Sequence, residues 1–162
     1  MLLVVEGMAM RLIMLLTCVV GIAKDGPVGP VTFYEKEVQD SAIALGMTAG
    51  GKLRRSAIFS GIAVMLPMLI VIPAMVYNLN GARGFTQGFL QMLAIGMIYG
   101  LFDRLFIDWC WVGKTNAWNI PGAEDLKPYI RGKTLATKWV GTLVAQPLYY
   151  ALTAWIMSLI LK

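Results

Sequence analysis

Three charged residues lie close together near the end of a long apolar run, in the stretch GLFDRLFIDW (residues 100–109). Asp103 and Arg104 are neighbours, and Asp108 follows four positions after Arg104. Residues four apart lie on one face of a helix, so Arg104 and Asp108 can pair. An ionisable residue inside a membrane is by default a candidate for function, because hydrocarbon offers a charge no partner. The free carboxylate of Asp103 would suit a cation or a proton.

Polar residues in other apolar segments extend this candidate site. Arg11 lies deep in the first segment, where an unpaired arginine costs about 2.5–3.5 kcal/mol on insertion scales. It would suit an anionic group, and Glu6 is its nearest possible partner in the sequence. We therefore predict a ligand or ion cavity formed by Arg11, Gln87, Gln91, Asp103 and Gln146. The alternative is that these residues are structural polar contacts within a bundle or an oligomer.

Several kinds of chemistry have no support in the sequence. There is no histidine, which is the commonest metal ligand and the usual general base near neutral pH. Cys18 and Cys110 are far apart and form no CxxC pair. The sequence motifs of nucleotide-binding loops, zinc proteases and serine hydrolases are also absent. We therefore predict no cofactor and no metal site.

The composition indicates that lipid is the solvent of this chain. Apolar residues make up 58% of it and charged residues 14%, against about 45–50% and about 25% in soluble domains. A membrane-spanning helix needs about 20 apolar residues. We predict an all-α integral membrane protein, a four-transmembrane-helix bundle forming a single domain over 1–162, with spans at about 2–23, 56–77, 85–107 and 139–161. A cleaved signal peptide is the alternative for the first of these.

Lys and Arg residues are distributed unevenly among the connecting segments. Residues 24–55 and 108–138 hold five each, whereas residues 78–84 hold only Arg83. The positive-inside rule then places both long loops in the cytoplasm and both termini outside, in a plasma or inner membrane. The net charge of +5 is explained by this topology, so we predict the lipid bilayer and not nucleic acid as the partner.

The third span has two distinct polar faces. Asp103 shares a helical face with Gly96 and Gly100, whose GxxxG spacing lets another helix approach closely. We therefore expect Asp103 to point into a helix–helix contact. Gln87 and Gln91 lie on the opposite face, so we place this span near the centre of the bundle.

The two long loops carry their own structural signals. Thr32 and Glu35 have the spacing of a capping box, followed by apolar residues at helical intervals, which predicts an amphipathic helix over about 32–49. The second loop contains a Pro121–Gly122 turn and is long enough to be structured. We expect it to dock a partner through Trp118, Glu124 and Asp125.

Three functions are compatible with these features. The first is binding or moving a small solute or ion through a polar intramembrane cavity, in a homo-oligomer that uses Gly96 and Gly100 as its contact face. The second is a non-catalytic subunit or assembly factor of a larger membrane complex. The third is a membrane-embedded lipid-modifying enzyme that uses the carboxylates of Asp108, Glu124 and Asp125. No motif supports catalysis, so a non-enzymatic role is favoured.

Overall fold

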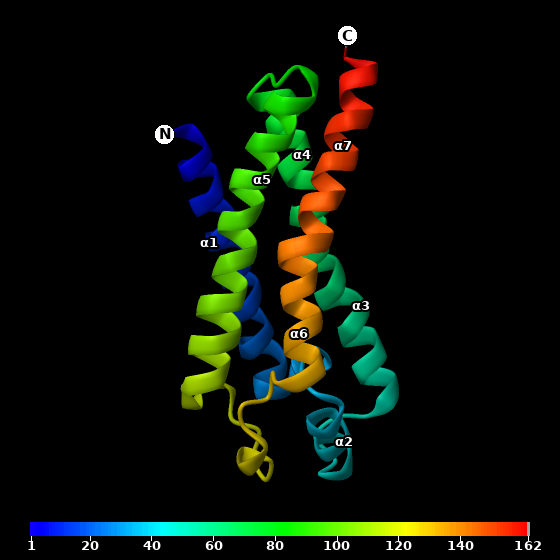
Figure 1. Cartoon of the computed structure of the whole chain (residues 1–162). Helices are drawn as coiled ribbons and strands as arrows, with labels where there is room; N and C mark the ends of the chain where they lie inside the picture. The colour runs from blue at the N-terminus through cyan, green and yellow to red at the C-terminus, as the bar shows by residue number, and fades with distance from the viewer. Residues whose placement is uncertain (162) are drawn as a thin grey trace.

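The computed structural model describes residues 1–161, and this part of the chain contains helices and no strand (Figure 1). Four helices are long and apolar enough to cross a membrane, which confirms the predicted all-α class and the four spans. They extend over Leu2–Val28, Gly50–Leu79, Gly84–Val112 and Gly132–Ile160.

Each span is longer than its predicted apolar segment. The spans contain 27 to 30 residues, or about 40–45 Å at 1.5 Å per residue, whereas the hydrocarbon core is about 30 Å thick. The basic stretches at 50–55 and 132–138, which we expected in loops, are therefore helical ends. Their long side chains can extend toward the headgroup region while the backbone stays helical.

The first half of the chain forms two spans joined by a helical connection. The first span is α1 (Leu2–Asp25), which is followed by 3-10 turns at Gly26–Val28 and Val31–Phe33 and then by α2 (Lys36–Ala44). The second span is α3 (Gly50–Leu66) and α4 (Ile72–Ala74), with π-helical turns at Pro67–Val71 and Met75–Leu79.

The second half repeats this plan with a more irregular connection. The third span is α5 (Gly84–Phe102), which continues as a π-helical segment over Asp103–Val112. Two 3-10 turns follow, at Asn116–Trp118 and Glu124–Leu126. The fourth span is α6 (Gly132–Val140) and α7 (Gln146–Ile160), joined by a π-helical turn at Gly141–Ala145.

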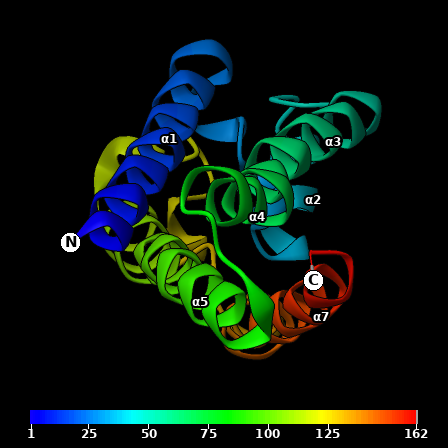
Figure 2. The same ribbon diagram turned by 90° about the horizontal axis from the view of Figure 1, so that it is seen from above.

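Helix α5 lies between α1 and α7 and packs against both, as its two polar faces predicted (Figure 2). The N-terminus, the 80–83 turn and the end of α7 lie at one end of the bundle, which we call the turn end (Figure 1). Residues 26–49 and 113–131 lie at the opposite end, the loop end. Toward the loop end α3 diverges from the other helices, and none of its residues is buried.

Gly96 and Gly100 allow the third span to pack closely against the fourth span of the same chain. A methyl group added at Gly96 would lie 2.3 Å from Tyr150 Cε2, and one at Gly100 would lie 2.8 Å from Thr142 Cγ2. The glycine face is therefore filled by the fourth span of the same molecule. This arrangement leaves it unavailable as the predicted contact between copies of the chain.

The predicted capping box at Thr32 and Glu35 is wrong. Thr32 lies in a 3-10 turn, and α2 starts at Lys36 with Glu35 as its N-cap residue. The Glu35 carboxylate instead accepts the backbone N–H of Thr134, at 3.0 Å. A contact between the start of α2 and the first turn of α6, which are far apart in the sequence, thus overrides the local capping signal.

Candidate functional site

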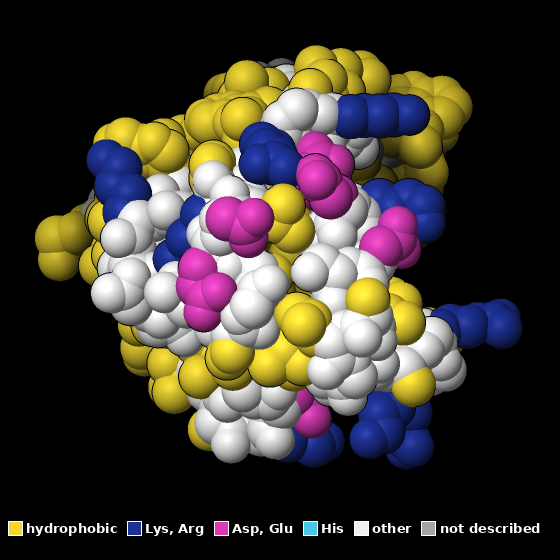
Figure 3. All heavy atoms as spheres, turned by 90° about the horizontal axis from the view of Figure 1, so that it is seen from below, with side chains coloured by type: hydrophobic (Ala, Val, Ile, Leu, Met, Phe, Trp, Pro, Cys, Tyr) yellow, Lys and Arg dark blue, Asp and Glu magenta, His cyan; other side chains and the backbone are white. Residues whose placement is uncertain are grey.

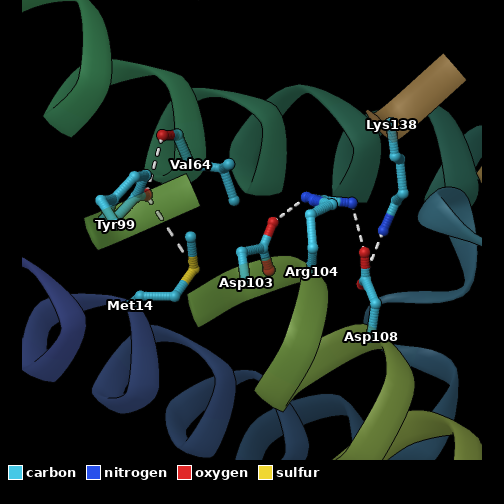
Figure 4. Close-up of polar contacts among 7 residues, drawn as sticks. All are labelled: Met14, Val64, Tyr99, Asp103, Arg104, Asp108 and Lys138. Carbon is cyan, nitrogen blue, oxygen red and sulfur yellow. Dashed lines mark hydrogen bonds and ion pairs between the residues drawn. The ribbon is translucent and has the colours of Figure 1, made fainter. Parts of the chain in front are cut away.

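Three buried charged side chains and one that is half-buried form a network at the loop end of the third span (Figure 4). Arg104 donates to the carboxylates of both Asp103 and Asp108. Lys138, from α6, donates its Nζ–H to Asp108 Oδ1 at 2.8 Å. The network holds two carboxylates and two cations, so its members neutralise one another, as buried charges require.

The π-helical geometry of this segment explains how one arginine reaches two carboxylates. A π-helix bonds residues five apart, whereas an α-helix bonds residues four apart. Asp103 and Asp108 are five apart and lie inside the π-helical segment Asp103–Val112, so the wider turn brings them toward one face. The sequence predicted the pair Arg104–Asp108, but Lys138 was missed because thirty residues separate it from Asp108.

The network forms part of the wall of a cavity of about 570 Å³. The cavity lies toward the loop end, between α1, α3, α5 and the α6–α7 helix. Its sides are mostly apolar, with residues such as Val64 and Met68 from the second span and Tyr149 from α7. Phe33, Tyr34, Trp118 and Ile130 close it at the loop end.

Two of the five predicted cavity residues line this cavity, and they are Asp103 and Gln146. Gln146 is buried and donates its amide N–H to the Tyr150 hydroxyl at 3.2 Å. A methyl group added at Gly100 would lie 2.9 Å from Gln146 Oε1. Gln146 of α7 therefore lies beside Gly100, which precedes Asp103 by about one helical turn.

The other three predicted residues lie elsewhere. The Arg11 guanidinium lies 5.6 Å from the centre of the Phe102 ring and makes no ion pair in residues 1–161. Gln87 accepts the backbone N–H of Arg83 at 2.9 Å, at the start of α5. Gln91 lines a smaller hollow at the turn end.

Glu6, the partner suggested for Arg11, bonds a different residue. Its carboxylate accepts the Asn80 side-chain N–H at 3.0 Å. The cavity lies toward the loop end, so the polar residues nearer the turn end do not reach it.

The predicted docking loop is folded back onto the bundle. Trp118 is only 1% exposed and packs edge-on against Trp111, with 5.0 Å between ring centres. Tyr129 accepts the backbone N–H of Ile120 at 2.9 Å. Trp118 is therefore a packing residue under the loop and not the surface anchor that we expected.

The acidic pair of this loop remains at the surface. Glu124 and Asp125 are exposed, and the Glu124 carboxylate accepts the backbone N–H of Gly122 at 2.8 Å. Asp108, the third carboxylate considered for catalysis, is buried in ion pairs on another segment. Glu124 and Asp108 thus bond different partners and do not share an interaction.

Burial changes the acidity of the side chains at the loop end. Removal from water raises the pKa of the Tyr34 and Tyr129 hydroxyls above the usual value for tyrosine. It lowers the pKa of Lys127, whose Nζ–H donates to the Thr115 carbonyl at 2.5 Å. Both tyrosines therefore stay neutral around neutral pH, and of the two hydroxyls that of Tyr129 takes part in a hydrogen bond.

Within residues 1–161, no group of three His, Cys, Asp or Glu residues is placed to hold a metal ion. Both cysteines are free thiols, and Cys18 lines the cavity. The chain matches no family model, no curated protein and no solved structure. Its function must therefore be argued from the geometry of the site.

Proposed function

We propose that this polytopic membrane protein binds a small, largely apolar molecule inside the membrane, in the cavity between α1, α3, α5 and the α6–α7 helix. The observation that supports this proposal most directly is the cavity of about 570 Å³. Pockets for small ligands usually have about 300–1,000 Å³ and a mostly apolar lining with few polar groups. Here the charged network and Gln146 supply the polar groups.

The position of α3 supports a lateral entry route for this ligand. Ser60 and Val64 of α3 line one side of the cavity, and Thr137 and Gly141 line the side that faces them. Seen from below, the outline of the molecule is hollowed between the lobes formed by α3 and α6 (Figure 3). A molecule dissolved in the bilayer could enter between these helices without crossing the loops.

The two other functions have less support in the geometry. The role of a docking subunit is less well supported, because Trp118, the aromatic residue expected to contact a partner, is buried. A lipid-modifying enzyme would need Asp108 together with Glu124 and Asp125, and Asp108 is already held by two cations. We therefore place binding in the cavity first.

Photolabelling of the protein in liposomes tests this function. A small uncharged aryl diazirine is added, and the labelled residues are mapped by mass spectrometry. We expect labels on Cys18 and Met68, which line the cavity. The lipid-facing Leu148, which is 64% exposed, should also be labelled.

A cavity-filling variant separates cavity labelling from labelling through lipid. Ser60→Trp places a large side chain in the cavity, whereas Ala57→Trp on the same helix lies outside its lining. Labels on Cys18 and Met68 should disappear in Ser60→Trp, remain in Ala57→Trp, and leave Leu148 unchanged in both. Equal labelling of Cys18 in all three proteins would contradict the proposal.

A further inference from the structure

We propose that the molecule bound in this cavity is a lipophilic cation, with one positive charge on an apolar or aromatic body. This inference rests on the proposed function, because it names the chemical class of the ligand for the same cavity. Three separate features of the lining support the cation proposal. They are its net charge, its oxygen atoms that accept no hydrogen bond, and its aromatic rings.

The residues that line the cavity carry a net negative charge. Three carboxylates line it, from Asp25, Asp103 and Asp108, together with two cations, from Arg104 and Lys138. Three negative charges and two positive charges give −1. Asp25 makes no ion pair within residues 1–161, whereas Asp108 is held by both cations. The network of Asp103, Asp108, Arg104 and Lys138 is neutral by itself, and the excess negative charge comes from the exposed Asp25. A positively charged ligand would bring the lining to neutrality, and an anion would double the imbalance.

Two buried side chains present acceptor oxygens that the protein itself does not use. Asp103 receives the Arg104 hydrogen bond on Oδ2, and its Oδ1 has no partner among the described residues. Gln146 donates through its amide nitrogen, and its Oε1 receives no hydrogen bond from residues 1–161. Both residues line the cavity. Carboxylate and amide oxygens accept hydrogen bonds and attract positive charge.

Aromatic rings supply the remaining part of a cation site. The cavity is lined by five of them, from Phe33, Tyr34, Tyr99, Trp118 and Tyr149. The face of an aromatic ring attracts a cation, and more strongly where water is excluded. One ring already does so, because Lys138 Nζ lies 5.5 Å from the centre of the Phe33 ring. A lining of this kind can attract the positive charge of an organic cation and also contact the apolar part of the same molecule.

Tetraphenylphosphonium and tetraphenylborate form a matched pair of probes, because they have nearly the same size and shape and opposite charge. Binding of tritiated tetraphenylphosphonium to the full chain in an uncharged detergent is measured by equilibrium dialysis, with protein-free micelles as the blank. We expect saturable binding at one site per chain. Unlabelled tetraphenylphosphonium should displace it, and the same concentration of tetraphenylborate should not.

Variants connect this binding to the cavity charge. Asp25→Asn and Asp103→Asn should each weaken tetraphenylphosphonium binding about tenfold, while Asp40→Asn should not. Asp40 pairs with Lys36 on the exposed face of α2, so it gives the same change in total charge away from the cavity. Asp25 lies outside the buried network, which keeps the test valid if Asp103→Asn does not fold.

The outcomes separate the ligand class from the existence of a ligand site. Equal displacement by the two probes would overturn the cation proposal and leave cavity binding intact. Absence of tetraphenylphosphonium binding, with Cys18 still photolabelled, would also overturn only the cation proposal. Absence of both binding and cavity labelling would overturn the proposed function itself.

Discussion

Arg104 is the residue on which the buried charge balance of the loop end depends. Its guanidinium is shared by two carboxylates, and Lys138 completes the network from another span. Arginine suits this position because its planar fork presents several N–H donors at fixed angles, whereas lysine presents a single charged centre. Removing a carboxylate partner leaves an excess cation, but removing Arg104 leaves two carboxylates with one lysine.

Replacement of Arg104 should therefore be strongly destabilising. We expect Arg104→Gln to lower the free energy of unfolding by about 3–5 kcal/mol, because loss of one partner leaves a buried charge uncompensated. The measurement is unfolding of the purified protein from mild detergent by added SDS.

Arg131 provides the matched control for this variant. It pairs with Glu37 at 2.7 Å, but both side chains are substantially exposed. An exposed ion pair contributes about 0–1 kcal/mol, so Arg131→Gln should have a small effect. Equal losses in the free energy of unfolding for the two substitutions would show that burial does not determine how much the Arg104 network stabilises the protein.

At the scale of elements, the second span is held by tyrosine hydroxyls from its neighbours. Pro73 lacks the N–H that would bond the Leu69 carbonyl four residues earlier in an α-helix. The Tyr149 hydroxyl donates to that carbonyl at 2.5 Å, and the Tyr99 hydroxyl donates to the Val64 carbonyl at 3.0 Å. The Tyr149 bond thus fixes the turn-end half of this span, and the Tyr99 bond reaches the end of α3. Ser56 of α3 donates to the Gly29 carbonyl at 2.8 Å. Because α3 contributes no buried residue, hydrogen bonds rather than buried side chains hold this wall of the cavity.

The contact between α5 and α7 depends on the absence of a side chain at Gly96. An added methyl group would lie 2.3 Å from Tyr150 Cε2 and 2.5 Å from Gln146 Nε2, closer than real contacts allow. We expect Gly96→Ala to destabilise the protein by about 1–3 kcal/mol, because overpacking forces neighbouring side chains from their positions. Unfolding in SDS measures this change.

Gly61 on α3 is the control for the helix propensity of alanine. An added methyl group there meets no atom within 4 Å. Gly61→Ala should therefore be neutral or stabilising by up to about 1 kcal/mol, since alanine favours the helix over glycine. Similar losses of stability at both positions would argue against the close contact at Gly96.

The elements were predictable from the sequence where the signal is local. The four spans follow from hydropathy, and the Arg104–Asp108 pair follows from helical spacing. The cap at Thr32 was mispredicted because Glu35 bonds Thr134, which is ninety-nine residues away. The burial of Trp118 likewise depends on how its loop folds onto other elements, which residue spacing does not determine.

At the scale of the whole molecule, the cavity was predictable only in part. Asp103 and Gln146 were expected to contribute to one site because they are polar residues in apolar helices, and both line the cavity. Arg11 and Gln91 have the same property and lie elsewhere. Their positions depend on the rotation of each helix and on the divergence of α3. These features arise from packing among all four spans, so a pattern within one segment cannot predict them.

The distribution of charge between the two ends predicts the orientation of the molecule in its membrane. The loop end carries Lys and Arg side chains around its rim (Figure 3). The turn between the second and third spans has a single basic residue, Arg83. Positively charged segments remain on the cytoplasmic side of membranes. We therefore expect the loop end to face the cytoplasm and the turn end to face outward.

Single cysteines report this orientation in a protein whose Cys18 and Cys110 have been changed to serine. In intact cells, a membrane-impermeant maleimide should label Asn78→Cys at the turn end, and it should not label Asp40→Cys or Glu124→Cys at the loop end. All three original side chains are exposed, so access depends on the side of the membrane and not on burial. Inside-out vesicles should give the reverse pattern. Labelling of the two loop-end cysteines in intact cells would invert the topology, and entry to the cavity would then be from the outer leaflet.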